Sequence, residues 1–393
     1  MPLVPPRPRI VAVDLVRGVI MIIMALDHTR DWVGGAALAA PTKLATTTPA
    51  LFFTRWITHF CAPTFCLLAG VAVRLSLARK SRGELARFLW TRGLWLIVLD
   101  AVVMRCLVMQ WNIDFHFTIV TTLWMLGWCM IALAALLYLP PIALAIVTAG
   151  ALAGHNLLDG IKPEQLGALA PLWIFFHAPG FLISNPDHAV FDAYPLIPWL
   201  AVMAAGYLLG AVYAWPDARR RTFLVATGVA MTAGFVILRW LNVYGDPSPW
   251  TPQATPIFTL LSFLNTTKQA PSLLFVLMTL GPVLVGLALA EAAPRWLSPV
   301  VTIGKVPLFY FVLHFFTLHV VALVISALDF GVVGNMFESP SLAQFPATFP
   351  PGWGFSLSWT YATWIAVVIA VYPACRWFAG IKQRRRDWWL GYL

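Results

Sequence analysis

Long apolar segments separated by short polar loops dominate the hydrophobic pattern of this chain. Each runs for about 20 residues with almost no charge, the length an α-helix needs to cross roughly 30 Å of hydrocarbon. Broken at proline, glycine and charge, the pattern predicts about ten spanning helices, at residues 10–30, 50–73, 93–111, 117–138, 141–159, 193–214, 222–241, 271–291, 303–326 and 357–379. The apolar segment 168–184 is interrupted by prolines, and we interpret it as interfacial or re-entrant, with a spanning role left open.

Composition supports this pattern. The 393 residues are 60% hydrophobic and only 11% charged, far from the composition of soluble domains. We therefore predict an all-α polytopic membrane helix bundle forming one domain, 1–393, whose main partner is the lipid bilayer. The net charge of +10 does not indicate nucleic-acid binding, because the cations lie in short loops between apolar spans.

The distribution of lysine and arginine predicts the orientation. Most of them fall on one side of the predicted spans, at Arg7 and Arg9, in the loop at 74–92, at 219–221 and at 382–386. Since short cytoplasmic loops are enriched in both residues, we expect both termini in the cytoplasm of a bacterial cell, with the chain multi-pass in its inner membrane. The histidines then fall in the outer half or outer loops, except His314 near mid-membrane, so chemistry is expected near the outer face.

The first predicted helix carries an unusual polar stripe. At 100° per residue, one face collects Asp14, Arg17, Met21, Met24 and His28, and such a face must meet protein or water rather than lipid. Asp14 and Arg17, three residues apart, form either part of a site or only an anchoring pair. At the outer end, Asp27 precedes His28 and is expected to orient the imidazole and raise its basicity, with Arg30 and Asp31 beside it.

Other polar residues fall on later spans. His59 lies a turn or two inside the outer face and either shares acid-base work with His28 or is capped by a carbonyl. In the ninth span Tyr310 and His314 share a face, whereas His319 lies about 140° from His314, so a two-histidine metal site on this helix is not expected. The candidate substrate-binding residues are Asp14, Arg17, Arg30 and Asp31 of the first span and its edge, and Lys268, Asn265, Trp199, Tyr310 and His319 elsewhere. Alternatively, Lys268 only extends its charge to the membrane interface, and Trp199 only anchors the chain in the aromatic belt.

No motif of soluble enzyme chemistry occurs in its required context. Walker, HExxH, GxSxG and dinucleotide-binding patterns are missing. The five cysteines show no CxxC spacing and are expected to be packing residues rather than disulfides or metal ligands. We therefore expect no metal.

Four motifs together carry a family resemblance. They are VDLVRG at 13–18, PLIPW at 195–199, TKQAPSLL at 267–274, and VPLFY at 306–310 followed by His314 and His319. In this order they resemble the bacterial relatives of heparan-α-glucosaminide N-acetyltransferase, within the transmembrane acyltransferase superfamily. The resemblance spans nearly the whole chain.

The resemblance implies transfer of an acetyl group from cytoplasmic acetyl-CoA to an acceptor, often a sugar, across the membrane. In the related lysosomal enzyme a key histidine lies in the first non-cytoplasmic loop beside a Trp-Asn-Gly sequence. Here the loop at 31–50 contains neither, which leaves His28 at its edge as the nearest candidate. Where that enzyme's second helix has an acid, this chain carries His59. The acceptor, and even the activity, can therefore differ from those of that enzyme.

From these observations we expect a membrane acyltransferase that uses acetyl-CoA or a similar thioester as acyl donor and a glycan amine or hydroxyl as acceptor. His28 is expected as general base or transient acyl carrier, Asp27 as its orienting group, and His59 and His314 as further acid-base or oxyanion-stabilising groups. Arg17 and the loop at 74–92 would attract the CoA phosphates. The alternatives are a transporter or exporter with an intramembrane polar path, or a non-catalytic scaffold. The sequence leaves open the acceptor, the acyl chain and whether the chain forms a homo-oligomer.

Overall fold

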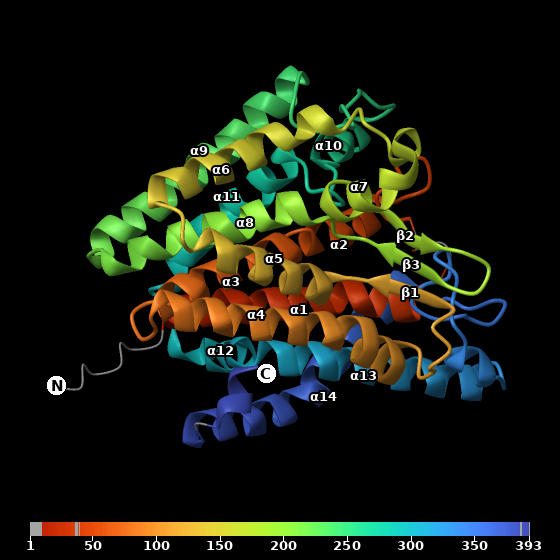
Figure 1. Cartoon of the computed structure of the whole chain (residues 1–393). Helices are drawn as coiled ribbons and strands as arrows, with labels where there is room; N and C mark the ends of the chain where they lie inside the picture. Colours follow the sequence, from red (N-terminus) through yellow and green to blue (C-terminus); the bar gives the residue numbers. More distant parts are fainter. Residues whose placement is uncertain (1–9, 36–37, 39, 386, 393) are drawn as a thin grey trace.

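The protein is a bundle of long helices that lie roughly side by side, as the computed structural model in Figure 1 shows. The structure describes residues 10–35, 38, 40–385 and 387–392. Its long helical segments fall on the predicted spans: α1 (Val11–Val33), α2 and α3 (Pro49–Thr58 and Cys61–Ser76), α4 (Arg82–Val98) with the π-helical η2 (Leu99–Met109), α5 (Thr122–Leu136), α6 (Pro141–Gly154), α8 (Leu196–Leu209), α9 (Asp217–Leu241), α11 (Leu273–Ala290), α13 (Pro307–Asp329) and α14 (Leu357–Arg384).

Within the described residues, seven helical segments are long and apolar enough to cross a membrane: Pro49–Ser76, Pro141–Leu158, Leu196–Ala214, Asp217–Leu241, Leu273–Ala290, Pro307–Asp329 and Leu357–Arg384. Helix α5 is apolar but only 15 residues long, and α1 carries several charges. The apolar helices therefore fit a multi-pass membrane protein, while the number of ten crossings stays a prediction.

The segment 168–184 does not form a long helix. It contains the end of η4 (Pro163–Leu169), the seven-residue α7 (Ala170–Phe176) and strand β2 (Gly180–Ser184). Seven residues rise only about 10 Å as a helix, about a third of the hydrocarbon thickness. In the structure this segment is not a spanning helix.

A small sheet covers one end of the bundle, a feature that the hydrophobic pattern did not predict. Strand β1 (Phe117–Val120) pairs in parallel with β3 (Ala189–Asp192), and β2 pairs antiparallel with β3, in the order β1-β3-β2. Residues 117–120, expected to begin the fourth span, thus belong to the sheet. The short helices α10 (Pro256–Leu264) and α12 (Ser298–Lys305) were likewise unforeseen, α12 being separated from α13 by a break before Pro307.

Close backbone contact fixes α12 against α1. A Cβ atom on Gly304 would lie 1.8 Å from the carbonyl oxygen of Asp14, and one on Gly18 would lie 2.0 Å from that of Val300. Small residues permit such approach between helices that share a membrane, where packing rather than water exclusion drives association. This contact positions the polar stripe of α1 inside the bundle.

The beginning of α1 and the end of the chain lie at the same end of the bundle as the basic loops. Ile10 packs near Ala290 and Leu297, and the carbonyl of Gly391 accepts a hydrogen bond from Arg92. Of the cations used for the orientation, Arg7, Arg9 and Arg386 lie outside the described residues. The gathering of basic segments at one end agrees with the expected orientation, which stays a prediction.

Candidate active site

A pair of histidines from α1 and α13 lies at the centre of the candidate site. Nδ1 of His28 is 2.7 Å from Nε2 of His314, and the two rings stack with centroids 5.0 Å apart. His314 is fully buried, whereas His28 is half-buried. The two residues are 286 positions apart, so the contact depends on how α1 and α13 pack.

The hydrogen-bond chain determines which nitrogen of His28 is basic. Nδ1 of His314 lies 2.8 Å from the main-chain oxygen of Tyr310, which only accepts, so this nitrogen carries the hydrogen. In the neutral pair, Nε2 of His314 must then accept from Nδ1–H of His28. Nε2 of His28 is consequently unprotonated and available as a base or nucleophile.

Aromatic rings shield this pair. The ring of Phe315 lies 4.0 Å from that of His28, and Phe311 meets His28 edge-on at 6.1 Å. The ring of Tyr310 stacks on His314 at 5.2 Å. Such packing holds both imidazoles in place and limits the access of water.

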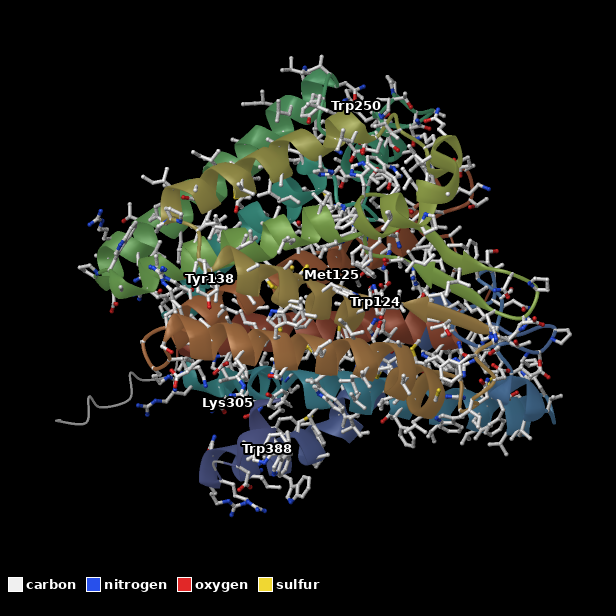
Figure 2. All side chains as sticks on the ribbon, viewed as in Figure 1. Trp124, Met125, Tyr138, Trp250, Lys305 and Trp388 are labelled. Atoms are coloured by element: carbon white, nitrogen blue, oxygen red, sulfur yellow. The ribbon has the colours of Figure 1, made fainter. Side chains whose placement is uncertain are left out.

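A cavity of about 490 Å³ approaches the pair from the basic end of the bundle. Its lining includes five cations near that end: Arg17, Arg79, Arg92, Lys305 and Lys382. Figure 2 labels Lys305, the last residue of α12, at the lower left of the bundle. Further along, the lining becomes apolar and reaches Met24 and Phe311, one helical turn from His28 on α1 and in contact with its ring. The cavity therefore leads from a cationic mouth to residues that adjoin the histidine pair, although neither histidine is part of its lining.

Most residues of the stripe predicted on α1 face the interior of the protein, as expected. Arg17, Met21 and Met24 all line the cavity. The alternative expectation, that Asp14 and Arg17 form an anchoring pair, also holds in part, because the carboxylate of Asp14 lies 3.3 Å from the guanidinium of Arg17. Asp14 itself is buried against α12.

On the other side of His28, Asp27 belongs to a cluster of buried charges rather than to the histidine pair. Its carboxylate contacts Arg55 of α2 and lies 3.1 Å from Arg30, which in turn lies 2.6 Å from Asp31. Opposite charges compensate one another here, as buried ions require. The group that hydrogen-bonds His28 is thus His314, where the sequence suggested Asp27.

Nε and Nη1 of Arg30 are buried without a hydrogen-bond partner among the described residues. Nδ1 of His59 also lacks a hydrogen-bond partner among these residues, and His59 is only 3% exposed. The ring of His59 packs against Phe275, with centroids 5.5 Å apart. A polar ligand would satisfy the N–H groups of Arg30 and the ring nitrogen of His59, which donates or accepts according to its tautomer.

The loop that precedes α11 brings further predicted residues near this region. Nζ of Lys268 lies 5.9 Å from the ring centre of Tyr194, which packs on the buried Trp199. The side chain of Asn265 donates to the carbonyl of Thr42. Asp192 lies near Tyr194 and outside the spans, and burial raises the pKa of its carboxyl to about 6.

Two predicted residues have structural surroundings instead. Both ring nitrogens of His319 lie 3.1 Å from main-chain oxygens, of Val108 and Met336, and its ring stacks between Trp32 and Trp111. Tyr310 is fully buried, and its main-chain carbonyl, rather than its phenol, contacts His314. These contacts favour packing and positioning over substrate contact.

Sequence reasoning overlooked Arg55 and the contact between His28 and His314. An arginine inside an apolar span, as Arg55 is, is itself a signal for a buried partner. The histidine contact has no signal in a single sequence.

Comparison with known proteins gives a family match. A family model described as heparan-alpha-glucosaminide N-acetyltransferase, catalytic, matches residues 9–250. The match includes His28, Arg55 and His59, while His314 lies beyond it. No curated protein matches significantly. Since the matched region is more than half of the chain, the protein belongs to the heparan-alpha-glucosaminide N-acetyltransferase catalytic-domain family.

Proposed function

We propose that this protein is a membrane N-acetyltransferase that moves an acetyl group from acetyl-CoA to an amine on a glycan. The observation that carries the proposal is the cavity that leads from a cationic mouth to Met24 and Phe311, which adjoin the pair of His28 and His314. The family match supports the reaction class. The donor, the acceptor and the location in a bacterial inner membrane are our own assignments.

The cavity fits the two chemical halves of CoA. Its cations suit the phosphates, and its apolar continuation past Met24 suits the pantetheine arm. From Arg17 to His28 a helix rises about 16 Å at 1.5 Å per residue, so an extended arm would lead the thioester from mouth to base. A volume of about 490 Å³ is within the usual range for small-molecule sites.

The chemistry assigned to His28 is general base catalysis. Nε2 removes a proton from the acceptor amine as its nitrogen attacks the thioester carbonyl. The carbon–sulfur bond then breaks, and the departing sulfur takes the proton back from His28. His314 holds Nδ1–H of His28 and stabilises the positive charge that the ring gains.

The charged cluster around Asp27 is our assigned acceptor side. Arg30 has buried N–H donors and His59 has a buried ring nitrogen without partners among the described residues, which suits hydroxyl groups of a sugar. Lys268 near Tyr194 adds a further donor. A glucosamine-terminated saccharide is therefore the first acceptor to test, with the face of the membrane following from the predicted orientation.

The test is equilibrium binding of radiolabelled acetyl-CoA to the purified full-length protein in detergent. Arg17→Ala should weaken binding at least fivefold because it removes a cation from the cavity lining. The matched control is Arg219→Ala, an exposed arginine elsewhere on the chain that stacks on Trp215. It should leave donor affinity unchanged.

Two outcomes would overturn the proposal. The first is undetectable binding of acetyl-CoA at millimolar concentration by a folded sample. The second is uptake of a glycan into proteoliposomes without any acyl donor, which would favour the transporter alternative.

A further inference from the structure

A second cluster of ligand-type side chains lies away from the candidate active site. It is formed by His155 of η3 (His155–Leu158), Asp159 directly after it, and His177 at the end of α7. Their ligand atoms all lie within 4.8 Å of one another. None of these residues contributes to the acetyl-transfer mechanism.

The two histidines are buried yet incompletely hydrogen-bonded. His155 is 3% exposed and His177 is 2% exposed. Both ring nitrogens of His155 and Nδ1 of His177 lack a partner of normal geometry among the described residues. Each such atom costs free energy unless something satisfies it. A bound ion would convert these lone pairs into ligands.

The carboxylate is already positioned between the rings and the surface. Oδ1 of Asp159 lies 3.3 Å from Nε2 of His177, and its side chain is 19% exposed, which leaves a route for entry. Oδ2 accepts a hydrogen bond from the amide of Asn156 at 2.8 Å. Metal-ligating carboxylates characteristically have such supporting partners.

From this arrangement we propose that His155, Asp159 and His177 bind one divalent transition-metal ion, with Zn²⁺ the best fit. Two imidazoles and one carboxylate form a ligand set that suits Zn²⁺ and its neighbours rather than Mg²⁺ or Ca²⁺, which prefer oxygen. Bonds of about 2.0–2.1 Å at tetrahedral angles place ligand atoms about 3.4 Å apart. The ligand atoms therefore need to move together by up to about 1.4 Å, and a fourth position is left for water.

The role of the ion would be to brace the outer loops. The carbonyl oxygen of the Asn156 side chain accepts from the amide of Leu273, the first residue of α11. The ring of Trp173 packs on His177 at 4.8 Å. A metal at this point would join α6, α7 and the start of α11. This proposal departs from the expectation, made from the sequence, that no metal binds.

The test uses the tag-free full-length protein, stripped with a chelator and titrated with Co²⁺ as a spectroscopic probe. Wild-type protein should bind one equivalent with visible d–d absorption, and Zn²⁺ should displace it. His177→Ala and Asp159→Asn should each weaken binding at least tenfold. The control variants His116→Ala and His188→Ala remove exposed histidines of outer loops and should bind as wild type.

Zn²⁺ should also raise the Tm of wild-type protein by about 2 °C or more, but not that of His177→Ala. This second readout shows whether the stripped variant is folded. Equal Co²⁺ spectra and affinities for wild type, His177→Ala and His116→Ala would refute the site. So would the lack of any stoichiometric binding by folded wild-type protein.

Discussion

Replacement of His28 tests the proposed mechanism most directly. If Nε2 of His28 is the base, His28→Ala should lower the rate of acetyl transfer at least 100-fold, which corresponds to about 2.7 kcal/mol of transition-state stabilisation. Donor affinity and Tm should stay nearly unchanged, because a base acts on the transition state. The assay is transfer of radiolabelled acetyl to a glucosamine-terminated saccharide, beside equilibrium binding of acetyl-CoA.

The contact with His314 extends this prediction. His314→Ala removes the acceptor that lies 2.7 Å from Nδ1 of His28. The lost hydrogen bond is worth about 1–3 kcal/mol, so the rate should fall roughly 5- to 150-fold. His314→Gln keeps an oxygen that can accept from Nδ1–H and should retain more activity than His314→Ala.

The double variant distinguishes a coupled pair from two independent groups. If His314 acts only through His28, His28→Ala with His314→Ala should be no slower than His28→Ala alone. Losses that multiply would refute the coupling. Turnover above about a tenth of wild type in His28→Ala would refute the base itself, and His59 would then be the leading candidate. His116→Ala, in an exposed loop, is the control.

Three further predictions concern stability. Arg55→Leu removes a buried partner of Asp27 and should cost about 3 kcal/mol by thermal or chemical denaturation, with Asp27→Asn in the same chain restoring part of it; no loss would contradict a buried ion pair. Asp192 has a native pKa of about 6 against a reference of 3.8, so the stability from its protonated form is complete below about pH 3.8 and is lost as the pH rises through 6. The free energy of unfolding of the wild type should therefore fall by up to about 3 kcal/mol between about pH 3.8 and 6, with a matching fall in Tm, and it should fall less in Asp192→Asn; identical slopes would refute this. Gly304→Val would place atoms against the backbone of α1 and should strongly reduce folded yield in size-exclusion chromatography, whereas Gly150→Val, which has nothing within 4 Å, should not.

The sequence by itself determined the class of the protein. Apolar segments of membrane length are a local property of the chain, so their positions follow from hydropathy alone, and the helices α1, α9 and α14 lie where the pattern predicted. Four short motifs identified the family that the comparison confirmed. The stripe on α1 also followed from helical periodicity, since it needs only the angle between residues.

The tertiary structure decided which polar groups meet. Asp27 was assigned to His28 because they are adjacent in sequence, but neighbours on a helix point about 100° apart, and the side chain of Asp27 contacts Arg55 of another helix instead. The partner of His28 comes from α13. Contacts between residues hundreds of positions apart depend on how helices pack, and packing in a membrane depends on small residues and polar pairs that hydropathy does not reveal.

The sheet and the cluster around His177 show the same limit. Strand β1 looked like the start of a helix because four apolar residues suit either structure, and only pairing with β3 decides between them. His155 and Asp159 are a helical turn apart, but His177 reaches them only because the chain folds back through α7. Local periodicity determines the elements, whereas the meeting of their side chains is a property of the whole fold.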